Sequence, residues 1–213
     1  MARRYRYEYL MRKRAKERAR KEREERIQNL SSSERKVREL IGWGLYIAVL
    51  VCAVHLVTTY VGQRTVVAGD SMLNTLHDKD NLIIDKVSYR FRDPERYEII
   101  VFPYRYAEGT FYIKRIIGLP GETVQIKDGY VYINEQKLGE TFGREVIRAD
   151  RYGQAAEPIT LGEDEYFVLG DNRNESSDSR ETSVGILKRE DLIGRAWVRI
   201  WPLDSFGSLA NEW

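Results

Sequence analysis

The chain is poor in the residues from which many enzymes build their sites. Its 213 residues include one cysteine and two histidines. One cysteine cannot form an internal disulfide, and so few cysteine and histidine side chains cannot supply the usual zinc ligands. We therefore expect no metal. Five prolines and sixteen glycines exclude collagen-like and proline-rich chains, while 42% hydrophobic residues are enough for a folded core.

The net charge of +2 is small only as a sum over unequal regions. Residues 1–40 hold fifteen basic and seven acidic residues, a net of +8, and the remainder has a net of −6. Residues 40–61 carry no formal charge when His55 is neutral. As a helix, these 22 residues would cover roughly 33 Å, which matches a bilayer core of about 30 Å. We predict a transmembrane anchor over residues 40–62.

A cleaved signal peptide is the alternative interpretation of this apolar run. It fits poorly, because the charged segment before the run and the run itself are too long, and no small-x-small site follows. The positive-inside rule places residues 1–39, a basic helical arm, in the cytoplasm and residues 63–213 outside it. The charge of the arm suits anionic lipid or a cytoplasmic partner. No folded recognition module accompanies it, so we expect no nucleic-acid binding.

The outer part, residues 63–213, has the pattern of a β-rich domain. Short segments rich in β-branched and aromatic residues alternate with turn residues, and Asp128-Gly129 between two alternating runs is typical of a two-residue hairpin. We predict a mostly antiparallel β domain with a hairpin insertion, an irregular excursion over residues 139–162 and a helical turn near 188–192. The predicted strands are residues 81–87, 98–103, 110–118 and 194–201.

Elimination narrows the chemistry of this domain. A serine-histidine-aspartate triad needs a histidine, and His77, the one histidine outside the anchor, lies in a polar loop six residues after Ser71. We consider it a poor candidate base. The chain has neither a phosphate-binding P-loop nor a dinucleotide fingerprint beside a strand. What remains is a serine or carboxylate nucleophile with a base other than histidine.

Two residues fit such a site. Lys114 lies in the apolar strand segment FYIKRII, where desolvation would lower its pKa and make it a general base. The alternative is an ordinary lysine at a strand edge. Arg115 would occupy the opposite face and need a carboxylate partner if buried. Ser71 follows Gly69 in AGDSMLNTL, where a tight turn would present its hydroxyl and backbone N–H together; the alternative is a serine that only completes a turn.

A third segment, GDNRNESSDSR at residues 170–180, is dense in polar groups directly after the apolar run EYFVL. It is either a solvated loop or a hydrogen-bonded shell that supports a site. Taken in order, GDSMLNTL, YIKRIIGLPGE and GDNRNESSDSRETSVG resemble the sequence boxes of bacterial type I signal peptidases, from the anchor to about Trp201. With glycine at position 69, the chain resembles the single-anchor branch of this family that is common in Gram-positive bacteria. Members of that branch lack a side-chain oxyanion donor at this position.

The resemblance implies a set of roles. Ser71 would be the nucleophile, with its N–H in the oxyanion hole, and Lys114 the general base. Ser176 would hydrogen-bond near Lys114 and orient it. The remaining shell residues would act in pairs, Asp171 with Arg115 and Asp178 with Arg180.

The resemblance also implies a fold of coiled antiparallel sheets and no cofactor. The substrate would be a secretory preprotein cleaved after a small-x-small site, its extended segment added beside a strand near residues 65–69. The lipid bilayer and, as a further candidate, the secretion translocon are the other expected partners. Two alternatives stay open: a self-cleaving Ser-Lys regulator with a cytoplasmic domain, and a non-enzymatic membrane-tethered β module. The last would be favoured if Ser71 and Lys114 lay far apart.

Overall fold

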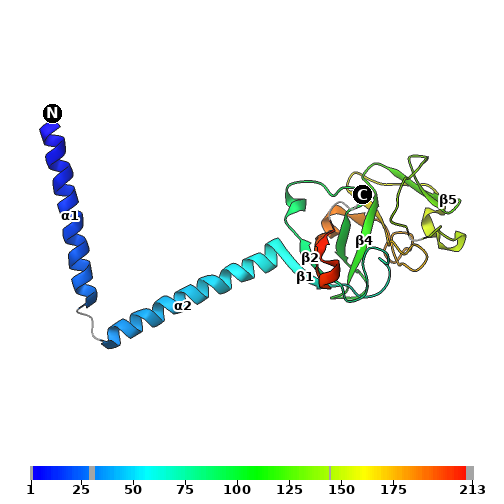
Figure 1. Cartoon of the computed structure of the whole chain (residues 1–213). Coiled ribbons are helices and arrows are strands. Elements are labelled where there is room, and N and C mark those ends of the chain that lie inside the picture. Colours follow the sequence, from blue (N-terminus) through cyan, green and yellow to red (C-terminus); the bar gives the residue numbers. More distant parts are fainter. Residues whose placement is uncertain (1, 29–31, 144, 210–213) are drawn as a thin grey trace. The chain divides into compact units, whose positions relative to one another are not determined.

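The computed structural model describes residues 2–28, 32–143 and 145–209 (Figure 1). Residues 1 and 29–31 of the predicted arm, and residues 144 and 210–213 of the predicted outer domain, lie outside the described residues. The chain divides into two compact units, residues 1–55 and 56–213.

The first unit and the first residues of the second are helical. Helix α1 runs over Ala2–Gln28 and helix α2 over Ser32–Leu56, and a π-helical turn η1 continues α2 over Val57–Val61. The described side chains of α1 are exposed, and Arg20 and Glu24 form an ion pair one turn apart at 2.8 Å. The helical stretch Glu34–Val61 is long and apolar enough to cross a membrane, and its most apolar part is not buried against the protein. The predicted charged helix followed by one apolar helix is therefore confirmed.

The second unit contains a large antiparallel sheet in the order β1-β2-β11-β3-β4-β9-β10, with β12 paired to β11. The mainly β prediction is confirmed. The strands are β1 Gly62–Val66, β2 Asn81–Asp85, β3 Ile99–Pro103, β4 Phe111–Gly118, β9 Glu165–Leu169, β10 Leu187–Lys188, β11 Gly194–Trp201 and β12 Gly207–Ser208.

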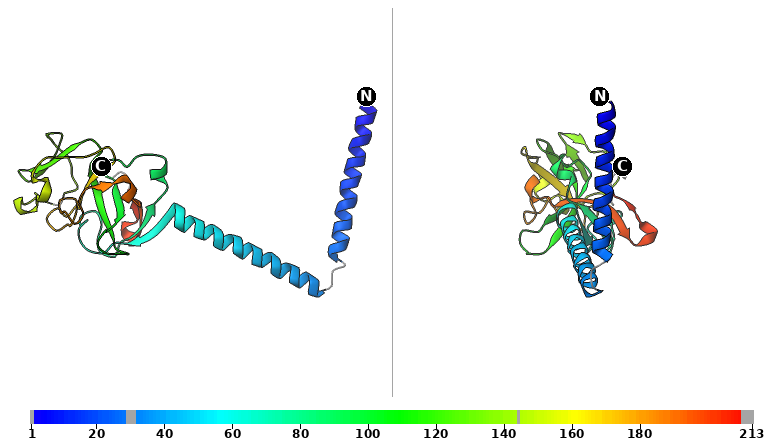
Figure 2. Two further views of the ribbon diagram at one scale, coloured as in Figure 1. Left: turned by 180° about the vertical axis from the view of Figure 1, so that it is seen from behind. Right: turned by 90° about the vertical axis from the view of Figure 1, so that its left-hand side faces the viewer.

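A small antiparallel sheet in the order β7-β6-β5-β8 lies at the end of this unit away from β1 (Figures 1 and 2). Its central hairpin turns at Asp128 and Gly129, both with positive φ (52° and 82°), so the predicted hairpin is confirmed. Its strands are β5 Thr123–Lys127, β6 Tyr130–Ile133, β7 Gln136–Lys137 and β8 Ile159–Thr160.

The predicted excursion over residues 139–162 holds two 3-10 turns, η3 Ala149–Arg151 and η4 Gly153–Ala156, but it also contributes strand β8. Sequence alone also missed β1, whose GQRTV is mostly polar and exposed. Both strands are placed by pairing with apolar neighbours, β1 with β2 and β8 with β5, and they stay largely exposed themselves. Two further 3-10 turns are η2 Ser88–Arg90 and η6 Leu203–Ser205. The helical turn expected near 188–192 is present as η5 Arg189–Asp191.

Two apolar clusters fix the segments that later form the site. Met72 and Leu76, almost fully buried, pack with residues of β2, β3 and β11 and so hold the segment around Ser71. Phe167 and Leu169 of β9 are fully buried in a second cluster with strands β5 and β6. The loop after β9 therefore leaves a rigid strand.

Candidate active site

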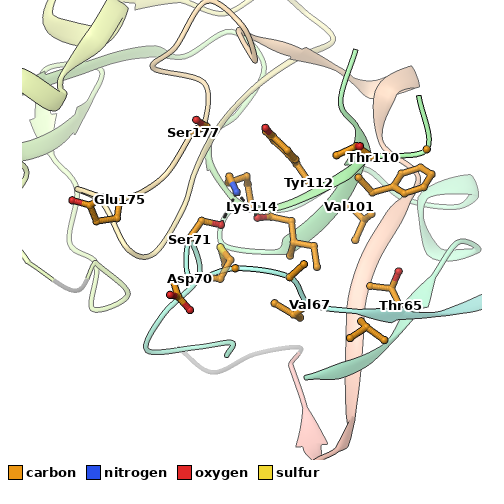
Figure 3. Close-up of a pocket in the computed structure, with 17 residues that line it drawn as sticks. Thr65, Val67, Asp70, Ser71, Val101, Thr110, Tyr112, Lys114, Glu175 and Ser177 are labelled. Carbon is orange, nitrogen blue, oxygen red and sulfur yellow. Dashed lines mark hydrogen bonds between the residues drawn. The ribbon is translucent and has the colours of Figure 1, made fainter. Parts of the chain in front are cut away.

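The structure brings Ser71 and Lys114 together. Lys114 Nζ donates a hydrogen bond to Ser71 Oγ at 2.8 Å and another to the Ile113 carbonyl at 3.0 Å (Figure 3). The two residues are 43 positions apart in the chain, one in a turn and one in β4. A large separation would have favoured a non-enzymatic module, and this contact removes that argument.

The Lys114 amine is buried, because the residue is only 4% exposed. Burial lowers the pKa of Lys114 to about 8, while the negative charges of Asp178 and Asp171 partly oppose the shift. Roughly a tenth of the amine is then neutral at pH 7, compared with well under a thousandth for a solvated lysine. A neutral amine within hydrogen-bond reach of a hydroxyl can accept its proton.

Ser71 is presented by a tight turn. Gly69 has a φ of +87°, and its N–H donates to the Asp78 carboxylate at 3.1 Å. A Cβ on Gly69 would meet no atom within 4 Å, so this position needs glycine for its backbone conformation and not for space. Downstream, the Leu73 N–H donates to the Asp70 carbonyl at 3.1 Å and closes the turn.

Arg115 and Asp171 form a buried bidentate ion pair. The guanidinium donates to the two carboxylate oxygens at 2.9 and 2.7 Å, and the two side chains are 4% and 0% exposed. Thr75 Oγ1 donates to the same carboxylate at 2.6 Å, and the guanidinium lies 3.7 Å above the Phe142 ring. This pair ties β4 to the segment of Ser71 and to the loop after β9.

Asp178 and Arg180 form a second buried bidentate pair, with distances of 2.7 and 2.8 Å. The Gly170 N–H also donates to Asp178, at 3.0 Å, and Arg180 reaches the Arg151 carbonyl at 2.9 Å. The Asp178 carboxylate thus links Gly170 to Arg180 within the loop. Its negative charge acts on Lys114 and raises the pKa of that lysine.

Ser176 is placed differently from the expectation. It is buried, but its Oγ has no hydrogen-bond partner within the described part of the chain, so the expected bond near Lys114 is absent. The hydroxyl instead packs against Gly170, where a Cβ would come within 2.2 Å of it and within 2.5 Å of the Ser71 carbonyl. Close packing of two loops, rather than a hydrogen bond, positions Ser176.

Sequence reasoning missed several shell residues. Asn172 hydrogen-bonds the backbone on both sides of Ser71, Arg173 forms a buried ion pair with Glu140, and Thr75 contacts Asp171. Asparagine and arginine are ordinary loop residues, so only the density of polar groups in residues 170–180 signalled them. No three histidine, cysteine or acidic side chains among the described residues are grouped to hold a metal.

A cleft of about 540 Å³ opens beside the dyad. Residues 65–72 line one wall and residues 109–114 the other, with Ser71 and Lys114 at one end (Figure 3). Val67 and Val101 give the floor an apolar character, and Asp70 and Glu175 lie at the end near Ser71. The shape suits an extended peptide.

Comparisons with known proteins agree on one family. The model of the family described as "Signal peptidase, peptidase S26" matches residues 40–201. The chain is 43% identical to a probable signal peptidase I-2 of Synechocystis sp., over 73% of this chain and 71% of the relative. It is 41% identical to signal peptidase I of Leptolyngbya laminosa (72% and 75% covered) and 32% identical to that of Bacillus amyloliquefaciens (79% and 92%).

Among solved structures, signal peptidase I of Enterococcus faecalis V583 is 36% identical and covers 49% of this chain and 97% of its own, with a TM-score of 0.41. The relatives from Synechocystis and Leptolyngbya are more similar in sequence than the Bacillus one, so the branch common in Gram-positive bacteria stays a prediction. The family model and these relatives each cover more than two thirds of the chain. The chain therefore belongs to the signal peptidase family, peptidase S26, and is an enzyme of that family.

Proposed function

We propose that the protein is a membrane-anchored serine endopeptidase that removes signal peptides from secreted preproteins, with Ser71 as the nucleophile and Lys114 as the general base. One observation carries the proposal: the Lys114 amine lies 2.8 Å from Ser71 Oγ and is buried, and its pKa is lowered to about 8.

The chemistry is acyl transfer. Neutral Lys114 takes the Ser71 proton as Oγ attacks the scissile carbonyl, whose oxygen becomes an oxyanion facing the Ser71 N–H. The protonated amine then gives its proton to the leaving nitrogen as the peptide bond breaks. A water molecule, deprotonated by Lys114, attacks the acyl-enzyme, and collapse of the second tetrahedral intermediate returns the proton to Ser71.

The surrounding polar groups hold these two residues and set the charge of the base. Asp171 with Arg115 ties the loop after β9 to β4 and, through Thr75, to the segment of Ser71, whereas Asp178 with Arg180 links the start of that loop at Gly170 to Arg180. Their carboxylates raise the pKa of Lys114 against the larger effect of burial. Ser176 contributes by packing against Gly170 beside the Ser71 carbonyl.

The apolar helix supports an anchor and a topology. We propose a cytoplasmic arm of residues 1–39, an anchor of residues 40–62 and an extracytoplasmic peptidase domain of residues 63–213. The stretch Glu34–Val61 is long and apolar enough to span a bilayer, and positive charge is concentrated before it. The bilayer, secretory preproteins and the secretion translocon would be the partners.

The cleft supports binding of an extended peptide. Strand β1 is an edge strand of the large sheet, and the segment that continues it to Gly69 lines the cleft. We propose that the substrate adds beside residues 65–69 by backbone hydrogen bonds, with small side chains on the apolar floor next to Ser71. Position −1 in the substrate is the residue before the cleaved bond.

The proposed function is tested with the full chain in detergent and a preprotein that carries an Ala-x-Ala site. We expect one cleavage, after the second alanine. Leucine in place of the alanine at position −1 should lower kcat/KM by about 100-fold. The reason is that the proposed floor accepts the single side-chain carbon of alanine, and leucine adds three more. Mass spectrometry of the products gives the site. No cleavage, or cleavage that is insensitive to this change, would reject the proposal.

Topology is tested separately, by protease treatment of intact cells. Loss of residues 63–213 with protection of the arm is the expected result. Protection of residues 63–213 would instead favour the self-cleaving regulator, which needs a cytoplasmic domain. An epitope at the C-terminus and one on the arm report the two sides in the same sample.

Activity should depend on pH through Lys114. Because the neutral amine is the active form, kcat/KM should fall tenfold per unit below pH 8 and level off above it, with about 50-fold more activity at pH 8 than at pH 6. Peptide cleavage measured from pH 5.5 to 9.5 gives the profile. A midpoint near the ordinary lysine value of 10.5, or activity that rises towards acid, would contradict the role of Lys114.

A further inference from the structure

Asn172 makes two hydrogen bonds to the backbone around the nucleophile. Its side-chain amide Nδ2 donates to the Asp70 carbonyl at 3.0 Å, and its backbone N–H donates to the Ser71 carbonyl at 3.0 Å. A carbonyl only accepts, so the donating side-chain atom is the amide nitrogen. Asn172 is 3% exposed, and its neighbour Asp171 is held by Arg115. The clamp is therefore rigid and buried.

These two bonds fix both peptide groups of Ser71. In a trans peptide the C=O and the N–H of one plane point in opposite directions. The Asp70 carbonyl is directed at Asn172, and also accepts from the Leu73 N–H, so the Ser71 N–H of the same plane points away from Asn172. Within the described part of the chain this N–H donates to no acceptor, although Ser71 lines the cleft.

We propose that Asn172 is the positioning residue of the oxyanion hole: by holding the Asp70 carbonyl, it aims the Ser71 N–H at the oxygen of the tetrahedral intermediate. The inference rests on the proposed function and adds the residue that orients its oxyanion donor. Gly69 has no side chain to supply a second donor, so the orientation of this single N–H carries more of the task. A fixed donor stabilises the developing charge without reorganising during the reaction.

The chain offers a matched control in the same loop. Asn174 is equally buried, 2% exposed, and makes two hydrogen bonds through its side chain, where Asn172 makes one through its side chain and one through its backbone. The bonds of Asn174 go to the Val146 carbonyl at 3.0 Å and from the Arg148 N–H at 2.9 Å, away from the nucleophile. Asn174→Ala therefore removes a comparable buried amide without touching the peptide groups of Ser71.

The full chain in detergent is assayed as wild type, Asn172→Ala and Asn174→Ala. We expect Asn172→Ala to lower kcat by about 10- to 100-fold with KM unchanged within about threefold, because orientation matters in the transition state and not in the bound substrate. Asn174→Ala should stay within about threefold of wild type in both constants. Equal losses in the two variants would overturn the proposal.

Two inhibitors distinguish a positioning role of Asn172 from poor folding of the Asn172→Ala variant. A peptide aldehyde ending in alanine adds to Ser71 Oγ, and its oxygen then occupies the oxyanion position, whereas the matching peptide amide binds without a covalent bond. Asn172→Ala should weaken the aldehyde by about the same 10- to 100-fold and leave the amide unchanged. This affinity ratio does not depend on the fraction of folded enzyme. An unchanged ratio would overturn the inference.

The pH profile is a further discriminator. If Asn172 acts through the oxyanion hole, the midpoint of the profile is the same in wild type and Asn172→Ala. A shifted midpoint would place its effect on Lys114 instead and contradict the proposal. Failure of the proposed function looks different, because then the wild type itself cleaves nothing.

Discussion

Lys114→Met and Ser71→Ala are each expected to lower kcat for preprotein cleavage by about 10⁴-fold or more, and the double variant should be no worse than either alone. Nucleophile and base act as one unit, so removing either removes the whole covalent route. Single-turnover cleavage measured over hours reveals the residual rate. Cleavage retained in either single variant would refute the Ser-Lys dyad.

The stability of the Lys114→Met variant provides the control for this experiment. The pKa of Lys114 is about 8 in the folded chain and near the ordinary lysine value of 10.5 when unfolded. Below pH 8 both states are protonated and burial of the charge opposes folding in full, by about 3 kcal/mol. Lys114→Met should therefore raise the melting temperature at pH 7, and the gain should shrink as pH rises from 8 towards 10.5. Lys127→Met, at an exposed position on β5 where the amine lies over the Tyr132 ring, should leave activity unchanged and alter stability by no more than about 1 kcal/mol.

Arg115→Met is expected to lower the free energy of unfolding by about 3–5 kcal/mol, because it leaves the Asp171 carboxylate, 0% exposed, without its countercharge. For a chain of this size the melting temperature should fall by roughly 6–20 °C. Thermal unfolding followed by tryptophan fluorescence measures the effect, and the site should lose activity along with stability.

An exposed ion pair serves as the comparison. Arg148 lies 3.6 Å from Glu175 with both side chains more than half exposed, so Arg148→Met should cost no more than about 1 kcal/mol. Replacing both buried partners, as Arg115→Met with Asp171→Leu, should restore part of the loss, since two apolar side chains leave no unpaired charge. If Arg115→Met and Arg148→Met were equally mild, the buried pair would not hold the site together.

Patterns among residues that are neighbours in the sequence predicted much of this fold. The turn at Asp128-Gly129 and the alternation around it predicted the β5–β6 hairpin, because turn chemistry and side-chain period act within a few residues. The same holds for Lys114: apolar residues flank it in sequence, and they indicated the burial that lowers its pKa. Because the sequence has so few histidines, a lysine is the stronger prediction for the base.

What sequence could not predict depends on residues distant in the chain. Strand β1 is polar and owes its place to pairing with β2. Thr75 meets Asp171 across 96 positions, and Asn172 meets Asp70 across 102, so no local pattern predicts either contact. Ser176 shows the opposite case: it lies in a recognisable motif, yet its hydroxyl has no hydrogen-bond partner within the described part of the chain.

With Lys114 as the proposed base, its burial also means that folding itself would activate the enzyme. In a nascent or partly unfolded chain the amine would be solvated, and its neutral fraction at neutral pH would be roughly 300-fold lower, as the difference between pKa values of 10.5 and about 8 requires. Ser71 would also lack its partner, because β4 reaches the nucleophile turn only in the assembled sheet. On the proposed mechanism, a chain that has not yet folded would therefore be an inactive precursor until β4 joins the sheet.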